Sequence, residues 1–372
     1  MKIKILVVFG TRPEAIKMGP LIKELKLNKD CFKTIVCVTA QHRQMLDSVL
    51  SFFDINADYD LNLMTEKQDL WNLTSDIMLK IKNVYDAEKP DLILVHGDTT
   101  TAMAASISAF YSKIKIGHVE AGLRTFNKYN PFPEEFNRLT IGNIADFHFS
   151  PTKQSANNLK KSLRHKSNIY VTGNTVIDAL MDTAKKSNFD FEKYKVSRVL
   201  KIILLTMHRR ENHGKNINDI CIAVKNLVKN NHNIQFVIPV HLNPNVKDAI
   251  RNILDGVDRV HLINSLDYGD FVGLMKASYI IMTDSGGIQE EAPSLKKPTL
   301  VLRVDTERPE AIKSGAVKLI GTNSIQIQNE VGKLLADHEY YSSMTNNIKN
   351  PYGNGNAAKK IVRILKNQIY KK

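Results

Sequence analysis

Two successive series of short apolar runs, each followed by a more polar stretch of helical period, constrain the fold of this chain most strongly. Near-continuous apolar strands that alternate with helices are typical of parallel sheets covered on both faces. Two such series predict an α/β chain with two Rossmann-like, doubly wound domains facing across a cleft. The predicted strands lie in KILVVF (4–9), TIVCVTA (34–40), LILVHGD (92–98), KIGHVE (115–120), FHFS (147–150), IYVTG (169–173), KIILLTMH (201–208), IQFVIPV (234–240), RVHLIN (259–264), YIIMTDS (279–285), PTLVLR (298–303) and AVKLIGT (316–322).

The domain organisation follows from the place where the pattern restarts. The chain of 372 residues is long for one core and suits two domains of ordinary size. A polar stretch at 185–197 separates the two series and is the best candidate linker. We expect an N-terminal Rossmann-like domain at 1–174, a C-terminal one at 175–355, and a terminal amphipathic helix at 356–372.

The hexapeptide RPEAIK occurs twice, at 12–17 and at 308–313. Each copy directly follows an apolar run, and ligands bind at the carboxyl ends of parallel strands. Proline suits a first helical turn, so each copy predicts a strand-to-helix turn with Arg12 or Arg308 at its tip. Two facing domains would aim both arginines at one ligand. Alternatively, RPEAIK is only a good helix start that the chain uses twice.

The stretch MTDSGGIQEEAPS contains a candidate phosphate turn. Ser285, Gly286 and Gly287 leave backbone N–H groups open at a helix start, where the helix dipole favours an anion. Glu290 or Glu291, on the first turns, could accept the two hydroxyls of a ribose. The alternative is a capped helix, because serine followed by glutamate is also a helix-start signal.

A dense basic cluster, LLTMHRRENHG, follows the first predicted strand of the second domain. Arginine binds phosphate through a bidentate fork, and His208 can donate to the same oxygens. A metal site at His208 and His213 lacks a third ligand with suitable spacing, so we predict no metal.

Three carboxylates follow consecutive elements of the first series. Asp98 and Glu120 end two predicted strands, and Glu134 lies with Glu135 on a proline-rich loop. A carboxylate at the tip of a buried strand is costly unless it has partners. The three acids together therefore predict a site, although Asp98 alone could equally cap a helix.

Composition excludes several classes of protein. No apolar stretch approaches the ~18 residues of a membrane span, and the amino terminus lacks a secretory pattern. The three cysteines lie in apolar runs and predict reduced thiols in the cytoplasm. The net charge of +14 comes from scattered lysines, which favours solvated surfaces over a nucleic-acid partner. Neither G-x-G-x-x-G nor a P-loop motif occurs, so we expect no dinucleotide cofactor.

The motifs, in this order, resemble those of the non-hydrolysing UDP-N-acetylglucosamine 2-epimerases. The resemblance implies the glycosyltransferase-B arrangement, a homodimer, and a last helix that crosses back to the first domain. The matching stretches span residues 9 to beyond 310 and are FGTRPEAIKMGPL, TAQHRQML, HGDTTT, HVEAGLRT, PFPEEFNR, TGNTVID, HRREN, DSGGIQEE and TERPEAI.

The resemblance also implies roles for individual residues. It places Arg12 and Lys17 at the diphosphate and reaction centre, and His208 on the diphosphate. It makes Asp98, Glu120 and Glu134 the acid and base candidates. Crowding of the three carboxylates should raise the pKa of some of them. The remaining implied positions are Ser285, Gly286 and Gly287 for a phosphate, Glu291 for the ribose, Arg308 toward the reacting sugar, and Gln41, Gln44 and His241 for a second, activating UDP-N-acetylglucosamine.

The implied activity is the reversible conversion of UDP-N-acetylglucosamine to UDP-N-acetylmannosamine through a glycal, without a cofactor, for surface polysaccharide synthesis. Two alternatives remain open within enzymes. One is a hydrolysing UDP-sugar 2-epimerase, and the other is a UDP-sugar transferase of the same architecture. Lys67 stands where an arginine is common in the family, and FNKYNP follows LRT where many relatives have a glycine.

Overall fold

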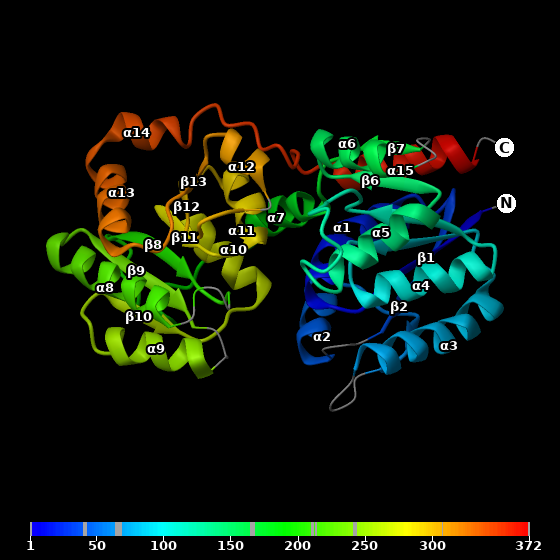
Figure 1. Ribbon diagram of the computed structural model, residues 1–372, viewed down its shortest axis with the longest axis horizontal. Coiled ribbons are helices and arrows are strands. Elements are labelled where there is room, and N and C mark those ends of the chain that lie inside the picture. The colour runs from blue at the N-terminus through cyan, green and yellow to red at the C-terminus, as the bar shows by residue number, and fades with distance from the viewer. Residues whose placement is uncertain are drawn as a thin grey trace. The chain divides into compact units, whose positions relative to one another are not determined.

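The computed structural model describes residues 2–39, 43–63, 69–163, 168–209, 212, 214–240, 244–306 and 308–370 (Figure 1). The chain divides into two compact units. Unit 1 comprises Met1–Ala179 and Tyr352–Lys372, and unit 2 comprises Leu180–Pro351.

Unit 1 is built on a seven-stranded parallel sheet with the order β3-β2-β1-β4-β5-β6-β7. The strand order reverses between β1 and β4, and such switch points are where ligands bind in α/β sheets. Its strands are β1 (Ile3–Phe9), β2 (Phe32–Val38), β3 (Tyr59–Asp60), β4 (Leu92–His96), β5 (Lys115–Val119), β6 (Phe147–Ser150) and β7 (Ile169–Val171). Its helices are α1 (Arg12–Leu27), α2 (Arg43–Phe52), α3 (Leu70–Glu88), α4 (Thr100–Tyr111), α5 (Glu134–Ile144), α6 (Lys153–Ser162), the start of α7 (Thr175–Lys186), and α15 (Ala357–Leu365) with a π-helical end, Lys366–Tyr370.

Unit 2 is built on a six-stranded parallel sheet with the order β10-β9-β8-β11-β12-β13, whose switch point lies between β8 and β11. Its strands are β8 (Lys201–Thr206), β9 (Ile234–Pro239), β10 (Val260–Ile263), β11 (Ile280–Thr283), β12 (Thr299–Val301) and β13 (Val317–Leu319). Its helices are α8 (Lys215–Asn230), α9 (Pro244–Leu254), α10 (Tyr268–Ala277), α11 (Gly286–Glu291), a 3₁₀ turn (Ala292–Leu295), α12 (Pro309–Lys313), α13 (Ser324–Ala336) and α14 (His338–Ser343).

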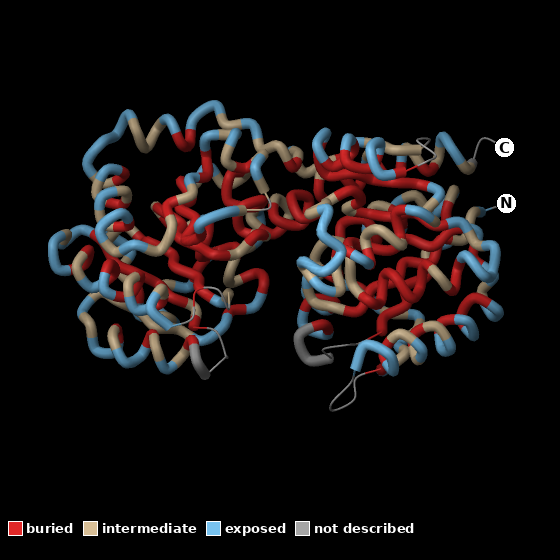
Figure 2. The backbone as a smooth tube through the Cα atoms, viewed as in Figure 1, coloured by how far each residue is buried: buried red, intermediate tan, exposed pale blue. Residues whose placement is uncertain are grey.

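Burial on both faces explains why the strands read as continuous apolar runs. In β1, Ile5 and Val7 pack into a core with α1, α2 and α15, whereas Leu6 and Val8 pack into a second core with α3 and α4. Figure 2 shows the buried sheets inside their exposed helices in each unit. The predicted fold class, two doubly wound α/β domains, is confirmed, and every predicted run contains a strand.

The last helix returns to the first unit. α15 packs on α1 and contributes Ile361 and Leu365 to the core on that face of the sheet. The carboxylate of Asp178, in α7, accepts hydrogen bonds from Ala357 N at 3.0 Å and Ala358 N at 2.9 Å, and so caps the amino end of α15. The carboxylate satisfies N–H groups that the helix itself leaves without partners.

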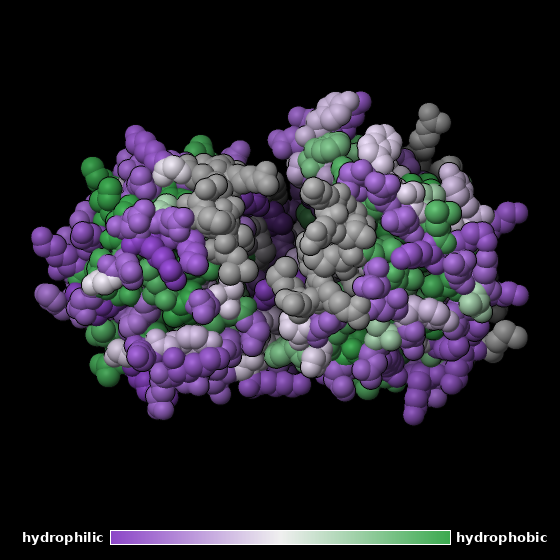
Figure 3. Space-filling view, turned by 90° about the horizontal axis from the view of Figure 1, so that it is seen from below, coloured by the Kyte–Doolittle hydropathy of each residue, from purple (hydrophilic) through white to green (hydrophobic). Residues whose placement is uncertain are grey.

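The face of the molecule drawn in Figure 3 is mostly polar. Hydrophilic side chains cover most of this face, with hydrophobic side chains scattered among them. Among the described residues, no helix is both long and apolar enough to cross a membrane. Cys31, Cys37 and Cys221 are free thiols.

Candidate active site

The carboxyl edge of the unit 1 sheet gathers the predicted acids. Glu120 directly follows β5, and Asp98 lies two residues beyond the end of the neighbouring strand β4. Gly97, between β4 and Asp98, has a φ of 64°, and its N–H donates to Val119 O at 2.9 Å. A Cβ placed on Gly97 would lie 3.7 Å from Glu120 Oε1. The ends of the two strands therefore hold Asp98 and Glu120 close to one another.

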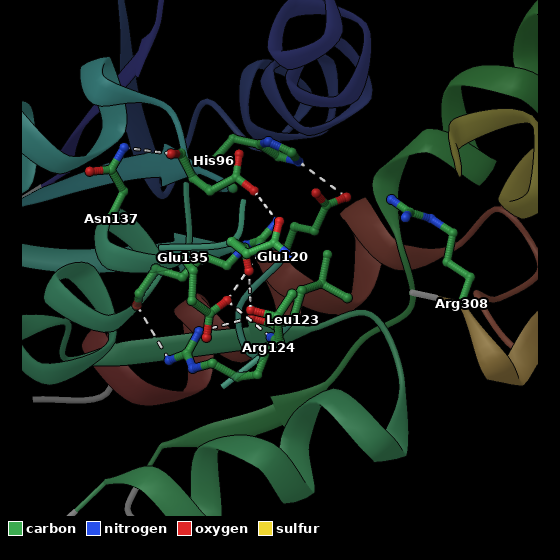
Figure 4. A network of polar contacts seen from close by, with 12 residues as sticks. His96, Glu120, Leu123, Arg124, Glu135, Asn137 and Arg308 are labelled. Carbon is green, nitrogen blue, oxygen red and sulfur yellow. Dashed lines mark hydrogen bonds and ion pairs between the residues drawn. The ribbon is translucent and has the colours of Figure 1, made fainter. Parts of the chain in front are cut away.

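Glu120 is the most heavily contacted of the acids (Figure 4). Its Oε2 accepts from Lys17 Nζ at 2.5 Å and from Asn174 Nδ2 at 2.7 Å, and lies 3.7 Å from His96 Nε2. Burial alone would raise the pKa of Glu120, but the charge of Lys17, then that of His96 and the two hydrogen bonds, lower the pKa to about 2. Crowding was expected to raise the pKa of some of the three acids, and Glu120 is not one of them, because Lys17 from α1 compensates the carboxylate. Glu120 is ionised at neutral pH.

Two buried histidines at this edge of the sheet, His96 and His118, are neutral at neutral pH. Burial lowers the pKa of His96 to about 4 and that of His118 to about 3. His118 Nε2 donates to Gly97 O at 2.7 Å and so holds the turn that carries Asp98. His96 Nε2 is buried and makes no hydrogen bond with the described residues. At neutral pH neither ring is charged, and His96 gains a charge only in acid.

Asp98 is held by the first turns of α5. Arg138 Nη2 lies 2.5 Å from Asp98 Oδ2, and Asn137 Nδ2 donates to Asp98 O at 2.8 Å. Arg138 Nη1 also contacts Glu135 Oε2 at 3.1 Å. One arginine therefore connects the carboxylate of Asp98, just beyond β4, to the buried side of α5.

The two neighbouring glutamates at the start of α5 differ in their surroundings. Glu135 is fully buried and accepts from Thr125 N at 3.1 Å and Phe126 N at 3.2 Å, so it holds the loop before the helix. Glu134 is the first residue of α5, and its buried Oε2 has no hydrogen-bond partner among the described residues. An unsatisfied buried carboxylate oxygen is costly, and such sites occur where a ligand or a proton is received.

The first RPEAIK copy forms the predicted strand-to-helix turn. Arg12 is the first residue of α1, directly after the capping Thr11. Glu14 of the hexapeptide accepts from Gly10 N at 3.0 Å, Thr11 N at 2.8 Å and Thr99 Oγ1 at 2.7 Å. Thr99 caps α4 next to Asp98. Glu14 therefore ties the turn after β1 to the turn after β4, across the switch point of the sheet, a link that the sequence analysis missed.

The second RPEAIK copy lies against the predicted phosphate turn of unit 2. Ser285 precedes α11, and a Cβ placed on Gly286 would lie 2.6 Å from Arg308 Nη1, so the guanidinium rests on this glycine. Arg308 Nε donates to Glu290 Oε1 at 2.7 Å. Arg308, predicted to reach toward a sugar, is thus held beside the turn at Ser285–Gly287.

The predicted ribose partner, Glu291, lies on the same short helix. It is 7% exposed, and its Oε1 accepts from Tyr268 Oη at 3.2 Å. Burial, followed by the charge of Glu291, raises the pKa of Tyr268. Tyr268 therefore remains a hydroxyl donor to Glu291.

His208 follows β8 on the other side of the unit 2 switch point. Its side chain is 41% exposed, and its Nδ1 lies 3.0 Å from Oδ1 of the fully buried Asp284. Sequence reasoning missed Asp284, although its position directly after β11 resembles that of Asp98 after β4.

Part of the predicted site lies outside the described residues. Gln41, His241, Lys67, Arg210 and His213 belong to this part of the chain. Of Gln44 only the backbone, in α2, is described. Within the described ranges, no group of three or more His, Cys, Asp or Glu side chains could hold a metal ion.

Comparison with solved structures identifies the class to which this fold belongs. An epimerase structure from Listeria monocytogenes matches with a TM-score of 0.93 and 46% identity, covering 100% of this chain and 98% of that one. The Neisseria meningitidis UDP-GlcNAc 2-epimerase bound to UDP-GlcNAc matches with a TM-score of 0.90 and 50% identity, covering 98% and 100% of the two chains. Two parallel-sheet α/β units with polar carboxyl edges therefore define an enzyme of the glycosyltransferase-B fold class.

Sequence comparison then identifies the family. The family model for UDP-N-acetylglucosamine 2-epimerase matches residues 23–366. The UDP-N-acetylglucosamine 2-epimerase of Campylobacter jejuni is 52% identical over 373 residues, which cover 97% of each chain. The chain belongs to the UDP-N-acetylglucosamine 2-epimerase family and is an epimerase, a member of the isomerase class, as its motifs indicate.

Proposed function

We propose that this protein interconverts UDP-N-acetylglucosamine and UDP-N-acetylmannosamine, and that it does so by eliminating and re-adding UDP. The observation that carries the proposal is the cluster of Asp98, Glu120 and Lys17 at the carboxyl edge of the unit 1 sheet, with Glu134 at the start of the next helix. The relative from Neisseria meningitidis was solved with UDP-GlcNAc bound.

The chemistry explains why several acids are needed. The proton on C2 of the sugar is not acidic enough for direct removal, so loss of the proton is coupled to cleavage of the C1–O bond. The bonding electrons leave with UDP, the C2 proton goes to a protein base, and a glycal with a C1–C2 double bond results. A protein acid then returns a proton to the opposite face of C2 while UDP adds back at C1. A base on one face and an acid on the other complete the inversion.

The environments of the acids favour different roles. Glu120 is ionised at neutral pH, so we assign it to accept a proton or to stabilise positive charge and not to donate. Glu134 has a buried Oε2 without a hydrogen-bond partner among the described residues, so this oxygen is available to the substrate. Asp98 is bound by Arg138 and can act only when that pair loosens.

Unit 2 supplies the groups that suit UDP. The turn at Ser285–Gly287 offers backbone N–H groups, Arg308 lies against it, and Glu291 faces Tyr268 nearby. Arginine and N–H donors stabilise the charge that develops on a leaving diphosphate. We assign the phosphates to the turn, Arg308 and His208, and the ribose to Glu291.

The test is incubation with UDP-N-acetylglucosamine in deuterated water, followed by NMR. We expect UDP-N-acetylmannosamine with deuterium at C2, and deuterium in the recovered substrate. A product without deuterium at C2 would contradict the elimination mechanism. Bulk release of free N-acetylmannosamine and UDP would indicate the hydrolysing alternative, and sugar transfer to an added acceptor would indicate a transferase.

We also propose that the protein is a homodimer that pairs through an apolar face of unit 1. Helices α3, α4 and α5 surround a hollow of about 700 Å³ lined by Met78, Met103 and Phe136. Large side chains on this face are exposed, including Trp71 at 86% and Phe132 at 61%. Contiguous exposed apolar surface of this kind marks interaction sites.

Sedimentation of two variants tests the dimer. Trp71→Glu should produce a monomer, because a buried unpaired charge is costly at an apolar interface. Val199→Glu is the matched control, since Val199 is 90% exposed but lies in unit 2. A dimer that survives Trp71→Glu, or a monomeric wild type, would reject this face as the interface.

The remaining parts of the proposal concern the cellular setting. The three free thiols fit a reduced compartment, so we place the reaction in the cytoplasm, where the product would feed surface polysaccharide synthesis. We retain a second UDP-N-acetylglucosamine as an activator at Gln41, Gln44 and His241. Sigmoidal dependence of the rate on UDP-N-acetylglucosamine, lost in Gln44→Ala, would support this.

A further inference from the structure

Asp284 is a fully buried carboxylate that lies at the switch point of the unit 2 sheet. Every donor that the structure gives it comes from the segment after β8. Asp284 accepts from His208 N at 3.0 Å, Arg209 N at 2.9 Å and Asn212 Nδ2 at 3.0 Å, and lies 3.0 Å from His208 Nδ1. A buried carboxylate is stable only with such compensation, so Asp284 and this segment hold one another in place.

Asp284 remains an anion in this setting. Burial alone would raise its pKa, but the hydrogen bond and charge of His208, with the N–H groups of Arg209 and His208, lower the pKa below its usual value. An ionised carboxylate only accepts hydrogen bonds, so His208 Nδ1 must carry the proton between them. The contact therefore sets which ring nitrogen of His208 carries a proton toward Asp284, as well as the orientation of the ring.

The orientation has a direct consequence for anion binding. With Nδ1 held by Asp284, the second ring nitrogen, Nε2, is the one left to meet a phosphate oxygen, and it donates there when the ring carries both protons. A buried carboxylate that holds an imidazole in this way fixes the tautomer and the orientation of the ring. His208 lies at the carboxyl edge of β8, and the turn at Ser285–Gly287 begins directly after Asp284. One carboxylate thus connects the histidine and the phosphate turn.

We propose that Asp284 is a positioning residue for the epimerase reaction, holding His208 as a donor to the diphosphate of the nucleotide when the C1–O bond breaks. The inference rests on the proposed function, because it assigns the role of His208 to the departing UDP. In this role Asp284 contacts His208 and not the substrate. Its effect on turnover must therefore pass through His208.

A double-mutant cycle separates this role from a purely structural one. Asp284→Asn keeps the side-chain shape and removes the charge, and should lower kcat roughly 10- to 100-fold with a smaller change in KM, as loss of an orienting carboxylate does elsewhere. His208→Gln should lower kcat further. The double variant should be no slower than His208→Gln alone, because the pathway through His208 is already lost.

A matched control comes from another carboxylate of unit 2. Glu330, on α13, contacts Lys318 Nζ at 2.8 Å and Tyr340 Oη, and takes no part in the segment after β8. Glu330→Gln should lower the melting temperature without changing kcat. The inference is overturned if the effects of Asp284→Asn and His208→Gln multiply, or if Asp284→Asn only lowers the melting temperature while the folded enzyme turns over normally.

A second measurement keeps Asp284 in place and so does not depend on whether Asp284→Asn folds. NMR of the full-length protein with ¹⁵N-labelled histidine reports which ring nitrogens carry protons, and the His208 signals are assigned by their loss in His208→Gln. We expect a protonated Nδ1 at neutral pH, and an unprotonated Nδ1 would overturn the inference. If the wild type fails to epimerise, the proposed function fails instead, and the spectrum still decides whether Asp284 holds His208.

Discussion

At the scale of single residues, Glu120 is unusual in its backbone as well as its contacts. Its φ of 64° lies in the left-handed region, which costs a non-glycine residue of order 1 kcal/mol or more. Such strain persists only where the surroundings enforce it. Lys17 and Asn174 both bind the side chain that this backbone presents. We interpret the strained position as the means of directing one carboxylate at the edge of the sheet.

Amide substitutions test the three acids. Asp98→Asn, Glu120→Gln and Glu134→Gln keep the shape of each side chain and remove its proton chemistry. Each variant should fold, bind UDP and lose at least about a hundredfold in kcat, the usual lower end for a positioned acid or base. Glu88→Gln is the control, because Glu88 pairs with Lys33 and Tyr59 away from the site.

The opposite outcome would identify structural carboxylates. If the three amide variants melt at lower temperature while their folded fraction turns over at the wild-type rate, the site assignment is wrong. Circular dichroism melting and UDP calorimetry on the same samples distinguish the two outcomes.

The contact between Lys17 and Glu120 predicts a specific change in the pH profile. Removing the charge in Lys17→Met leaves the burial of Glu120 uncompensated, so the pKa of Glu120 must rise from about 2. If ionised Glu120 is needed for turnover, the acidic limb of kcat/KM moves to higher pH and the rate falls. Lys17→Arg retains the charge and should retain the position of that limb. An unchanged limb in Lys17→Met would show that Glu120 does not govern it.

At the scale of elements, both switch points are bridged by a buried carboxylate. In unit 1, Glu14 at the start of α1 accepts from Thr99 at the start of α4. In unit 2, Asp284 after β11 accepts from the segment after β8. The turns that a parallel sheet brings together at this point are thereby fixed to one another. A ligand at either point would meet side chains whose positions are already set, which favours catalysis.

Two threonine caps of unit 1 test the importance of this link. Thr99 caps α4 and donates to Glu14 at the switch point, whereas Thr152 caps α6, which follows β6 away from the switch point. Thr99→Val and Thr152→Val should each lose about 1 kcal/mol of unfolding free energy with the cap. Only Thr99→Val should also lower kcat, by roughly tenfold or more, since the turns that carry Arg12 and Asp98 loosen. Equal kcat values in the two variants would remove the link from the mechanism.

The sequence predicted elements better than it predicted contacts. Short apolar runs identified twelve of the thirteen strands found in the described residues, because burial on both faces leaves a continuous signal. The exception, β3, has only two residues, Tyr59 and Asp60, and one of them is charged. Such an edge strand carries no apolar run to find.

Contacts between distant segments left weaker signals. Asp284 and His208 are separated by 76 residues, and Glu14 and Thr99 by 85. Asp284 lies in a predicted strand and Glu14 in a predicted helix start. The local pattern was enough to explain each residue, so neither indicated a distant partner. The same limit applies to Glu120, because the distance from Lys17 in sequence hid the partner that lowers its pKa. Sheet topology supplies these pairs, and only the assembled fold reveals them.

At the scale of the whole molecule, the described histidines with strongly lowered pKa values lie in unit 1. Burial lowers the pKa of His96 to about 4, of His118 to about 3 and of His148 to about 4. In unit 2, burial lowers the pKa of His261, whose side chain is less buried than those three. The two units therefore differ in how their stability responds to acid.

The sign of the effect follows from proton binding. Below the ordinary pKa of about 6.5, the unfolded chain protonates these histidines while the folded unit does not, so acidification favours unfolding. The slope is up to about 1.4 kcal/mol per pH unit for each histidine, and it acts as the pH falls from about 6.5 toward 4. Glu120 adds to the loss only at lower pH, between about 4.5 and 2, because its folded-state pKa is lowered.

Unit 1 should therefore lose stability before unit 2 when the pH falls from neutrality to about 5. Urea unfolding at each pH, with hydrogen exchange read by mass spectrometry, measures the two units separately in the intact chain. His148→Gln should lower the slope of the unfolding free energy of unit 1 against pH by the contribution of about one proton. The slope for unit 2 should stay unchanged, because His148 lies in β6 of the unit 1 sheet. Earlier loss of protection in unit 2, or no loss in unit 1 above about pH 5, would show that the buried histidines do not control acid stability.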